Sequence, residues 1–154
     1  MRVIFFAVFI LVPVVAGANS ETEVAKFTER FYQQFNSSSD PGDLRKFFAK
    51  SPVFQLGEQP AISSDANFSP RMIEILRESM GVADYPYTGL VIDISNISDD
   101  GSATLAVVFK RAKSKNEYQK ALCSIFSLAK LKEGWKIIGW SMYGTTHESR
   151  CTWA

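Results

Sequence analysis

The chain has 154 residues, 46% of them hydrophobic, and its 17 lysines and arginines almost balance 16 aspartates and glutamates. That size and composition are those of one globular domain rather than two. The balanced charge excludes the strongly basic surface by which proteins bind nucleic acid or an anionic membrane, so neither is expected as a partner. A local basic run within residues 110–115 is expected to be a solvated loop between strands.

The N-terminus has the pattern of a secretory signal peptide. Arg2 precedes an apolar run over residues 3–15, and Ala16-Gly17-Ala18 is a small-residue cleavage site. A membrane anchor is the alternative, but a spanning helix needs about 20 apolar residues and this run is shorter. We expect residues 1–18 to be removed and residues 19–154 to form a single secreted, extracellular domain without membrane attachment.

The first half of the predicted domain is expected to be helical. Residues 20–23 form a capping box, and an apolar stripe at helical spacing follows it. This stripe consists of Val24, Phe27, Phe31 and Phe35. A second helix is predicted from Asp40, its N-cap, to a stop at Ser51-Pro52.

Two further segments precede the change of pattern. Residues 53–56 are a short apolar stretch that fits either a strand or a helical turn. Ser69-Pro70 repeats the N-cap and first-turn pattern and opens a third predicted helix, which Gly81 ends.

Beyond Pro86 the apolar period changes from about 3.6 residues to 2. Four strands joined by short turns are predicted over residues 87–97, 103–109, 118–131 and 135–143. Such strands form an antiparallel meander, whose apolar face needs a cover, and the three helices supply it. The predicted fold class is therefore α+β, with N-terminal helices packed on the concave face of a curved antiparallel sheet.

Cys123 and Cys151 are the two cysteines of the sequence. In an oxidising compartment they are expected to form one disulfide, closing a loop of about 28 residues. Two free thiols, one of them buried, or an intermolecular bridge through Cys151 are the alternatives. A catalytic cysteine is not expected, because the single His147 falls on a predicted irregular tail.

Three segments match the N-glycosylation pattern, namely Asn36-Ser37-Ser38, Asn67-Phe68-Ser69 and Asn96-Ile97-Ser98. Behind a signal peptide, they predict a glycoprotein of a eukaryotic secretory pathway. In a bacterial source they would carry no meaning.

Two features carry a family resemblance. One is the opening helical hairpin over residues 23–49, and the other is the closing hairpin over residues 128–138, where a Gly134-Trp135-Lys136-Ile137 run enters the last strand. This arrangement resembles the nuclear transport factor 2-like superfamily, the cystatin-like or ketosteroid-isomerase-like α+β cone. The resemblance implies an apolar pocket between the concave sheet face and the helices, and frequent homodimers through the convex face. Such domains include isomerases, carriers and silent binding modules, so fold alone does not choose among them.

Several aromatic and acidic residues are candidates to line that pocket. They are Tyr85, Tyr87, Asp93, Tyr118, Trp135, Trp140 and Tyr143. Family isomerases and dehydratases need a base near the pocket, and Asp93 is an acid in the middle of an apolar strand. Strand alternation, however, places Asp93 opposite Leu90 and Ile92, which predicts a solvated carboxylate. The odd spacing of Trp135 and Trp140 predicts that their rings lie on opposite faces.

No catalytic residue, metal ligand set or cofactor motif is assigned. His147 has no second ligand at metal spacing, and the glycines are too scattered for a phosphate-binding loop.

The leading hypothesis is a secreted, non-enzymatic domain that binds a small hydrophobic ligand, or a protein partner such as a second copy, through the pocket or the sheet face. The alternative is an isomerase- or dehydratase-like enzyme, in which Asp93 or Glu58 would lie in a closed cavity within reach of Tyr118 or Tyr143. A cystatin-type protease inhibitor ranks last, because no Gln-x-Val-x-Gly run is present.

Overall fold

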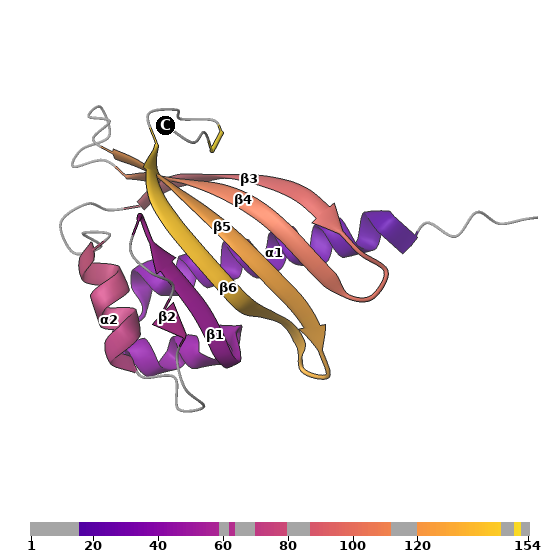
Figure 1. Ribbon diagram of the computed structural model, residues 1–154, viewed down its shortest axis with the longest axis horizontal. Helices are drawn as coiled ribbons and strands as arrows, with labels where there is room; N and C mark the ends of the chain where they lie inside the picture. The colour runs from indigo at the N-terminus through magenta and orange to yellow at the C-terminus, as the bar shows by residue number, and fades with distance from the viewer. Residues whose placement is uncertain are drawn as a thin grey trace, which may run out of the picture.

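The computed structural model describes residues 16–58, 62–63, 70–79, 87–111, 120–145 and 150–151. Within them the chain forms α1 (Ala16–Ser37), the 3-10 helix η1 (Pro41–Phe47), β1 (Phe48–Leu56), β2 (Ile62–Ser63), α2 (Pro70–Ser79), β3 (Tyr87–Ile97), β4 (Ser102–Arg111), β5 (Lys120–Leu131) and β6 (Gly134–Thr145). Figure 1 shows α1 lying across one face of a curved sheet, with α2 at the end where β1 and β2 lie.

The sheet has six strands in the order β2-β1-β6-β5-β4-β3. Strands β3 to β6 form the predicted antiparallel meander. Strand β1 pairs parallel with β6, and Phe54 lies opposite Trp140 in this pairing. The predicted α+β class, with helices on a curved sheet, is confirmed. The sheet is mixed rather than wholly antiparallel, because a strand from the first half of the chain joins it.

The first helix begins earlier than predicted. It starts at Ala16, so residues 20–23 lie inside α1 and do not form a capping box. Backbone N–H groups inside a helix find carbonyl partners one turn back and need no cap. The Glu23 carboxylate instead forms an ion pair with Lys130 Nζ at 2.7 Å. Residues 1–15 lie outside the described residues, and cleavage of a signal peptide stays a prediction.

The second predicted helix is shorter than expected. Asp40 caps it as predicted, and its carboxylate accepts a hydrogen bond from Gly42 N at 2.7 Å. The helix is of the 3-10 type and ends at Phe47, before the expected stop at Ser51-Pro52. Poorer hydrogen-bond geometry keeps 3-10 helices short.

Strand β1 begins where that helix was expected to continue. Phe48 is already extended, with φ −101° and ψ 149°, and pairs with Ile137 of β6. Sheet pairing therefore overrides the local helical pattern, and residues 53–56 belong to a strand. The third helix, α2, starts at Pro70 as predicted, while its expected end at Gly81 lies outside the described residues.

The core lies between α1 and the inner face of the sheet. Its helical side consists of Val24, Phe27, Phe31, Tyr32 and Phe35, which are at most 6% exposed. Rings from the sheet, including Phe109, Phe126 and Trp140, meet them. Among the described residues, no helix combines the length and apolarity that crossing a bilayer requires.

Candidate functional site

Aromatic rings fill the concave side of the sheet, where the resemblance implies a pocket. Phe31 of α1 has its ring centroid 5.2 Å from that of Trp140 and 5.8 Å from that of Phe126, both in edge-to-face contact. Tyr32 and Phe35 pack beside it on the same helix face. All five side chains are at most 1% exposed. The described residues on this side therefore form a packed core rather than an open pocket.

Trp135 and Trp140 lie on the same side of β6, which corrects the prediction that they face opposite sides. The pairing of β6 with β5 skips Ile138, so this residue forms a β-bulge. One extra residue reverses the alternation of side chains beyond it. Trp135 and Trp140 are consequently both buried, at 7% and 1% exposure, while Ile138 is 39% exposed.

The two candidate acids face away from the core. Asp93 is exposed, whereas its neighbours Ile92 and Ile94 pack against the core, so the prediction from alternation is confirmed. Glu58, in the turn after β1, is exposed as well. The isomerase hypothesis therefore has no core-facing base at either of these positions.

The tyrosines expected around the pocket do not gather there in the described part of the chain. Tyr85 and Tyr118 lie outside the described residues, and for Tyr87 only the backbone is described, at the start of β3. Tyr143 pairs with Cys123 on the side of the sheet away from the core. Partial burial there raises the pKa of the Tyr143 phenol above its usual value. The structure thus separates Tyr143 from Trp140 by placing them on opposite faces.

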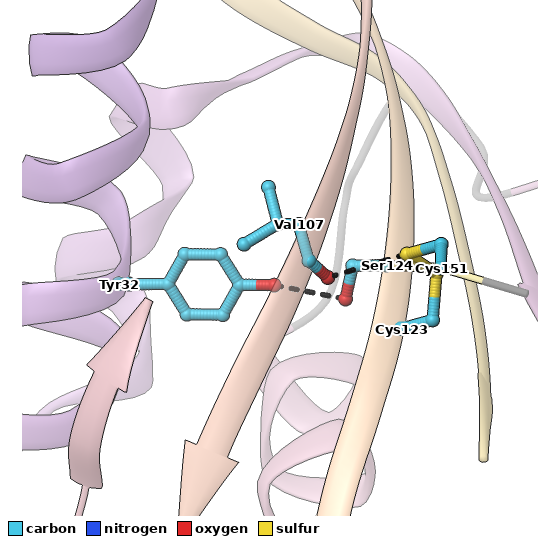
Figure 2. Close-up of a disulfide and its surroundings, with 5 residues drawn as sticks. All are labelled: Tyr32, Val107, Cys123, Ser124 and Cys151. Carbon is cyan, nitrogen blue, oxygen red and sulfur yellow. Dashed lines mark hydrogen bonds between the residues drawn. A yellow bond between two sulfur atoms is a disulfide. The ribbon is translucent and has the colours of Figure 1, made fainter. Parts of the chain in front are cut away.

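Sequence reasoning missed one polar contact inside the core. Tyr32 Oη donates a hydrogen bond of 2.8 Å to Ser124 Oγ, and both residues are fully buried. Figure 2 shows the Tyr32 side chain reaching from the helix to the strand that carries Ser124, while the neighbouring Cys123 points to the opposite side. A serine within an apolar strand is the signal that could have indicated a buried partner.

The outer face of β4, β5 and β6 carries three rows of paired residues. The rows are Val108–Cys123–Tyr143, Ala106–Ile125–Ser141 and Thr104–Ser127–Gly139. None of these residues is charged, although charged residues make up 21% of the chain. Next to the last row lie two exposed apolar side chains, Val53 at 42% and Ile138 at 39%. These three rows are thus an uncharged surface of mostly short side chains, and on β3 the middle row is continued by the exposed Asp93, which pairs with Ala106.

Cys151 lies against one end of this face. Cys123 and Cys151 are joined in a disulfide, with their Cα atoms 5.4 Å apart, which agrees with the predicted pairing. Cys151 Sγ also lies 3.8 Å from the carbonyl oxygen of Val107 (Figure 2). Cys123 and Val108 are buried, at 0% and 2% exposure, although they lie on the side away from the core. The first row is therefore covered, and the other two remain open.

The predicted glycosylation sites differ in their surroundings. Asn96 is exposed at the end of β3, and its side-chain amide donates to Ser98 Oγ at 3.1 Å. Asn36 lies in the last turn of α1, where its amide donates to the carbonyl of Tyr32 at 2.7 Å. Asn67 lies outside the described residues, and use of the three sites stays a prediction.

No cluster of three or more histidine, cysteine, aspartate or glutamate side chains occurs among the described residues. His147 lies outside them.

Solved structures share this fold at low sequence identity. A Pectobacterium atrosepticum protein of unknown function from the DUF3225 family matches with a TM-score of 0.59 and 18% identity, over 84% of this chain and 93% of its own. A Nostoc punctiforme domain with a cystatin-like fold matches with a TM-score of 0.60 and 14% identity, over 86% and 81%. The yeast UBP3-associated protein BRE5 matches with a TM-score of 0.57 and 12% identity, over 82% and 97%.

These likenesses establish the fold, and sequence comparison gives the family. A search of curated proteins found no match to the chain. A family model described as NTF2-like protein (DUF6841) matches residues 20–145, which include α1 from its second turn and every strand of the sheet. The chain belongs to this NTF2-like family.

Proposed function

We propose that the chain is a secreted, non-enzymatic binding domain that associates with a second copy of itself through the open rows of the outer sheet face. The observation that carries the proposal is the lack of charge across Ala106–Ile125–Ser141 and Thr104–Ser127–Gly139. Charged residues are depleted at the centres of protein interfaces, because an unpaired buried charge is costly.

The symmetry of a two-fold contact, the lack of charge and the short side chains make a second copy a suitable partner for this surface. A two-fold contact uses the same patch on both partners, so the patch must be compatible with itself. A neutral patch meets this condition, whereas a patch of one charge would repel its copy. Short side chains such as Ser127 and Gly139 let two sheets approach closely, and exposed Val53 and Ile138 supply apolar area at the rim.

Two further observations support binding over catalysis. The concave side is packed with rings, and the candidate bases Asp93 and Glu58 are exposed. The yeast neighbour is described as a UBP3-associated protein, so a protein of this fold takes part in protein association. A signal-peptide pattern and a disulfide support the secreted location.

The test is the molar mass in solution of the protein purified from a secretory host, measured by light scattering over a range of concentrations. We expect the wild type to have twice the mass of a single chain and Ser141→Arg, at the β6 end of one open row, to have the mass of one. Gln33→Arg adds the same charge on the exposed surface of α1 and serves as the control, which should remain dimeric. Circular dichroism verifies that both variants fold.

A monomeric wild type would overturn the proposal, as would a dimer that survives Ser141→Arg. If the wild type is monomeric but co-purifies with one defined protein through the same face, self-association is wrong and a heterologous partner replaces it.

A further inference from the structure

A groove on another part of the molecule is lined by charged side chains, unlike the open rows of the outer sheet face. It lies between α1, η1 and the turn that joins β5 to β6, and its volume is about 830 Å³. Its floor consists of Phe27, Phe47 and Trp135, which are only 6–7% exposed. This volume falls within the range of about 300–1,000 Å³ that is usual for ligand sites.

Basic side chains lie along both walls of the groove. Lys26 and Arg30 come from α1, Lys46 from η1 and Lys136 from β6. In the described part of the chain, none of these four forms an ion pair with a carboxylate. The fifth cation of the groove, Lys130, is already paired with Glu23 at 2.7 Å. An excess of unpaired positive charge therefore faces the groove.

Three of these cations contact neutral groups. Arg30 Nε donates to the carbonyl oxygen of Lys26 at 3.3 Å, and Lys136 Nζ donates to that of Lys46 at 2.5 Å. The ammonium group of Lys46 lies 5.6 Å from the centre of the Phe47 ring. Each of these groups has further N–H donors beyond the bond it makes, because guanidinium has five and ammonium has three. The donors left over are available to an anion.

The length of the groove points to an extended ligand. Its helical wall runs from Glu23 to Gln34, and at 1.5 Å per residue this wall is about 16 Å long. An extended peptide rises about 3.3 Å per residue, so roughly five residues match the wall.

The acidic residues of the groove decide what kind of anion fits. Glu29 and Glu133 also line it and are not paired with any cation among the described residues. A uniformly charged polyanion, such as a sulfated polysaccharide, would meet both carboxylates with like charge. A peptide avoids this, because its uncharged residues and amide donors can lie beside the two glutamates while its own carboxylates reach the cations.

We propose that this groove binds an extended acidic peptide segment of about five residues, with carboxylates spaced by uncharged residues. The bound segment contacts Arg30 on one wall and Lys136 on the other. This site is independent of the outer sheet face, since the groove shares no residue with the open rows there. The peptide-binding proposal can therefore be overturned while self-association is confirmed, and the reverse.

The experiment measures the binding of a fluorescently labelled Glu-Ser-Glu-Ser-Glu peptide by anisotropy. Arg30→Gln with Lys136→Gln removes one cation from each wall, and the expected loss of affinity is on the order of tenfold or more. Lys50→Gln removes an exposed charge of β1 outside the groove and is expected to bind like the wild type. Binding should also weaken as salt rises, because exposed charges are screened.

Three results would overturn the proposal. One is a lack of saturable binding by the wild type, and another is an equal loss of affinity in Lys50→Gln. The third is tighter binding of a sulfated oligosaccharide or of inorganic phosphate than of the peptide, which would assign the groove to polyanions or to small anions. Circular dichroism confirms that the variants are folded.

Discussion

Tyr32 on α1 and Ser124 on β5 are joined by a buried hydrogen bond of 2.8 Å inside a largely apolar core. The Tyr32 ring also stacks on Phe109, with centroids 4.9 Å apart and planes 21° apart. Dispersion and ring packing alone would tolerate small shifts of the helix along the sheet, whereas a buried hydrogen bond has a fixed length and direction. We infer that this pair sets the position of α1 on the sheet.

Removing the Tyr32 hydroxyl tests that role. Tyr32→Phe keeps the ring on Phe109 but leaves the buried Ser124 hydroxyl without its donor, so we expect a loss of about 1–2 kcal/mol in the free energy of unfolding. The double variant Tyr32→Phe with Ser124→Ala should lose less than the sum of the single losses, because no orphaned group remains. Urea titration measures all three. Additive losses would mean that the bond contributes no coupling energy.

The Glu23 carboxylate gives stability a defined dependence on pH. Its hydrogen bonds to Lys130 and then to Trp135, with the charge of Lys130, hold the pKa of Glu23 below its usual value. A lowered folded-state pKa means that the stabilisation is present above the unfolded-state pKa and is lost as pH falls through the folded-state value. We therefore expect Glu23→Gln to be less stable than the wild type at neutral pH, and this difference to vanish in acid.

Thermal melts across the acid range measure that difference. Glu21→Gln changes an exposed glutamate two residues away on the same helix and serves as the matched control. A deficit for Glu23→Gln that stays constant down to strongly acidic pH would show that the ion pair has no part in it.

The bulge at Ile138 makes neighbouring residues of β6 differ sharply in their tolerance of substitution. Trp140 is 1% exposed and is surrounded by aromatic rings, so Trp140→Ala should cost about 3–5 kcal/mol. Ile138→Thr replaces a side chain that is 39% exposed and keeps its β-branch, so its cost should stay within about 0.5 kcal/mol. Chemical denaturation compares the two. Similar losses would place Ile138 inside the core and would contradict the bulge.

The disulfide closes a loop of 28 residues, and the chain-entropy model gives it about 3–4 kcal/mol. Cys151→Ser breaks the bond and leaves the buried Cys123 side chain in place, so a loss of this size is expected in urea titrations. Treatment of the wild type with a thiol reductant should produce the same loss, and reductant should have no effect on Cys151→Ser. If reductant destabilises both proteins equally, it acts by some route other than this bond.

The local sequence pattern was enough to predict much of the fold. Period-two strands separated by Asp99-Asp100-Gly101 and Lys132-Glu133-Gly134 indicated the meander, and Gly101 and Gly134 do adopt positive φ, 85° and 98°. The phenylalanine stripe of α1 indicated its buried face. In these turns and in this helix, the residues that determine the local structure lie close to one another in the chain.

The remaining features depend on partners far away in the chain. Phe48 becomes a strand residue because Ile137 pairs with it, and Glu23 meets Lys130 across 107 residues. The extra residue at Ile138 reverses the alternation from which the faces of Trp135 and Trp140 were predicted. Alternation showed which side chains of each strand share a face, but the uncharged rows depend on the register between strands.

Self-association through the outer sheet face can be tested by measuring the distance between matching positions in two copies of the protein. The disulfide occupies both native cysteines, so a spin label can be attached at Thr104→Cys on the open rows or, in a second sample, at Gln33→Cys on α1. Association through the outer sheet face predicts a shorter label-to-label distance for position 104 than for position 33 by pulsed electron paramagnetic resonance. The reverse order, or no dipolar coupling in either sample, would contradict it.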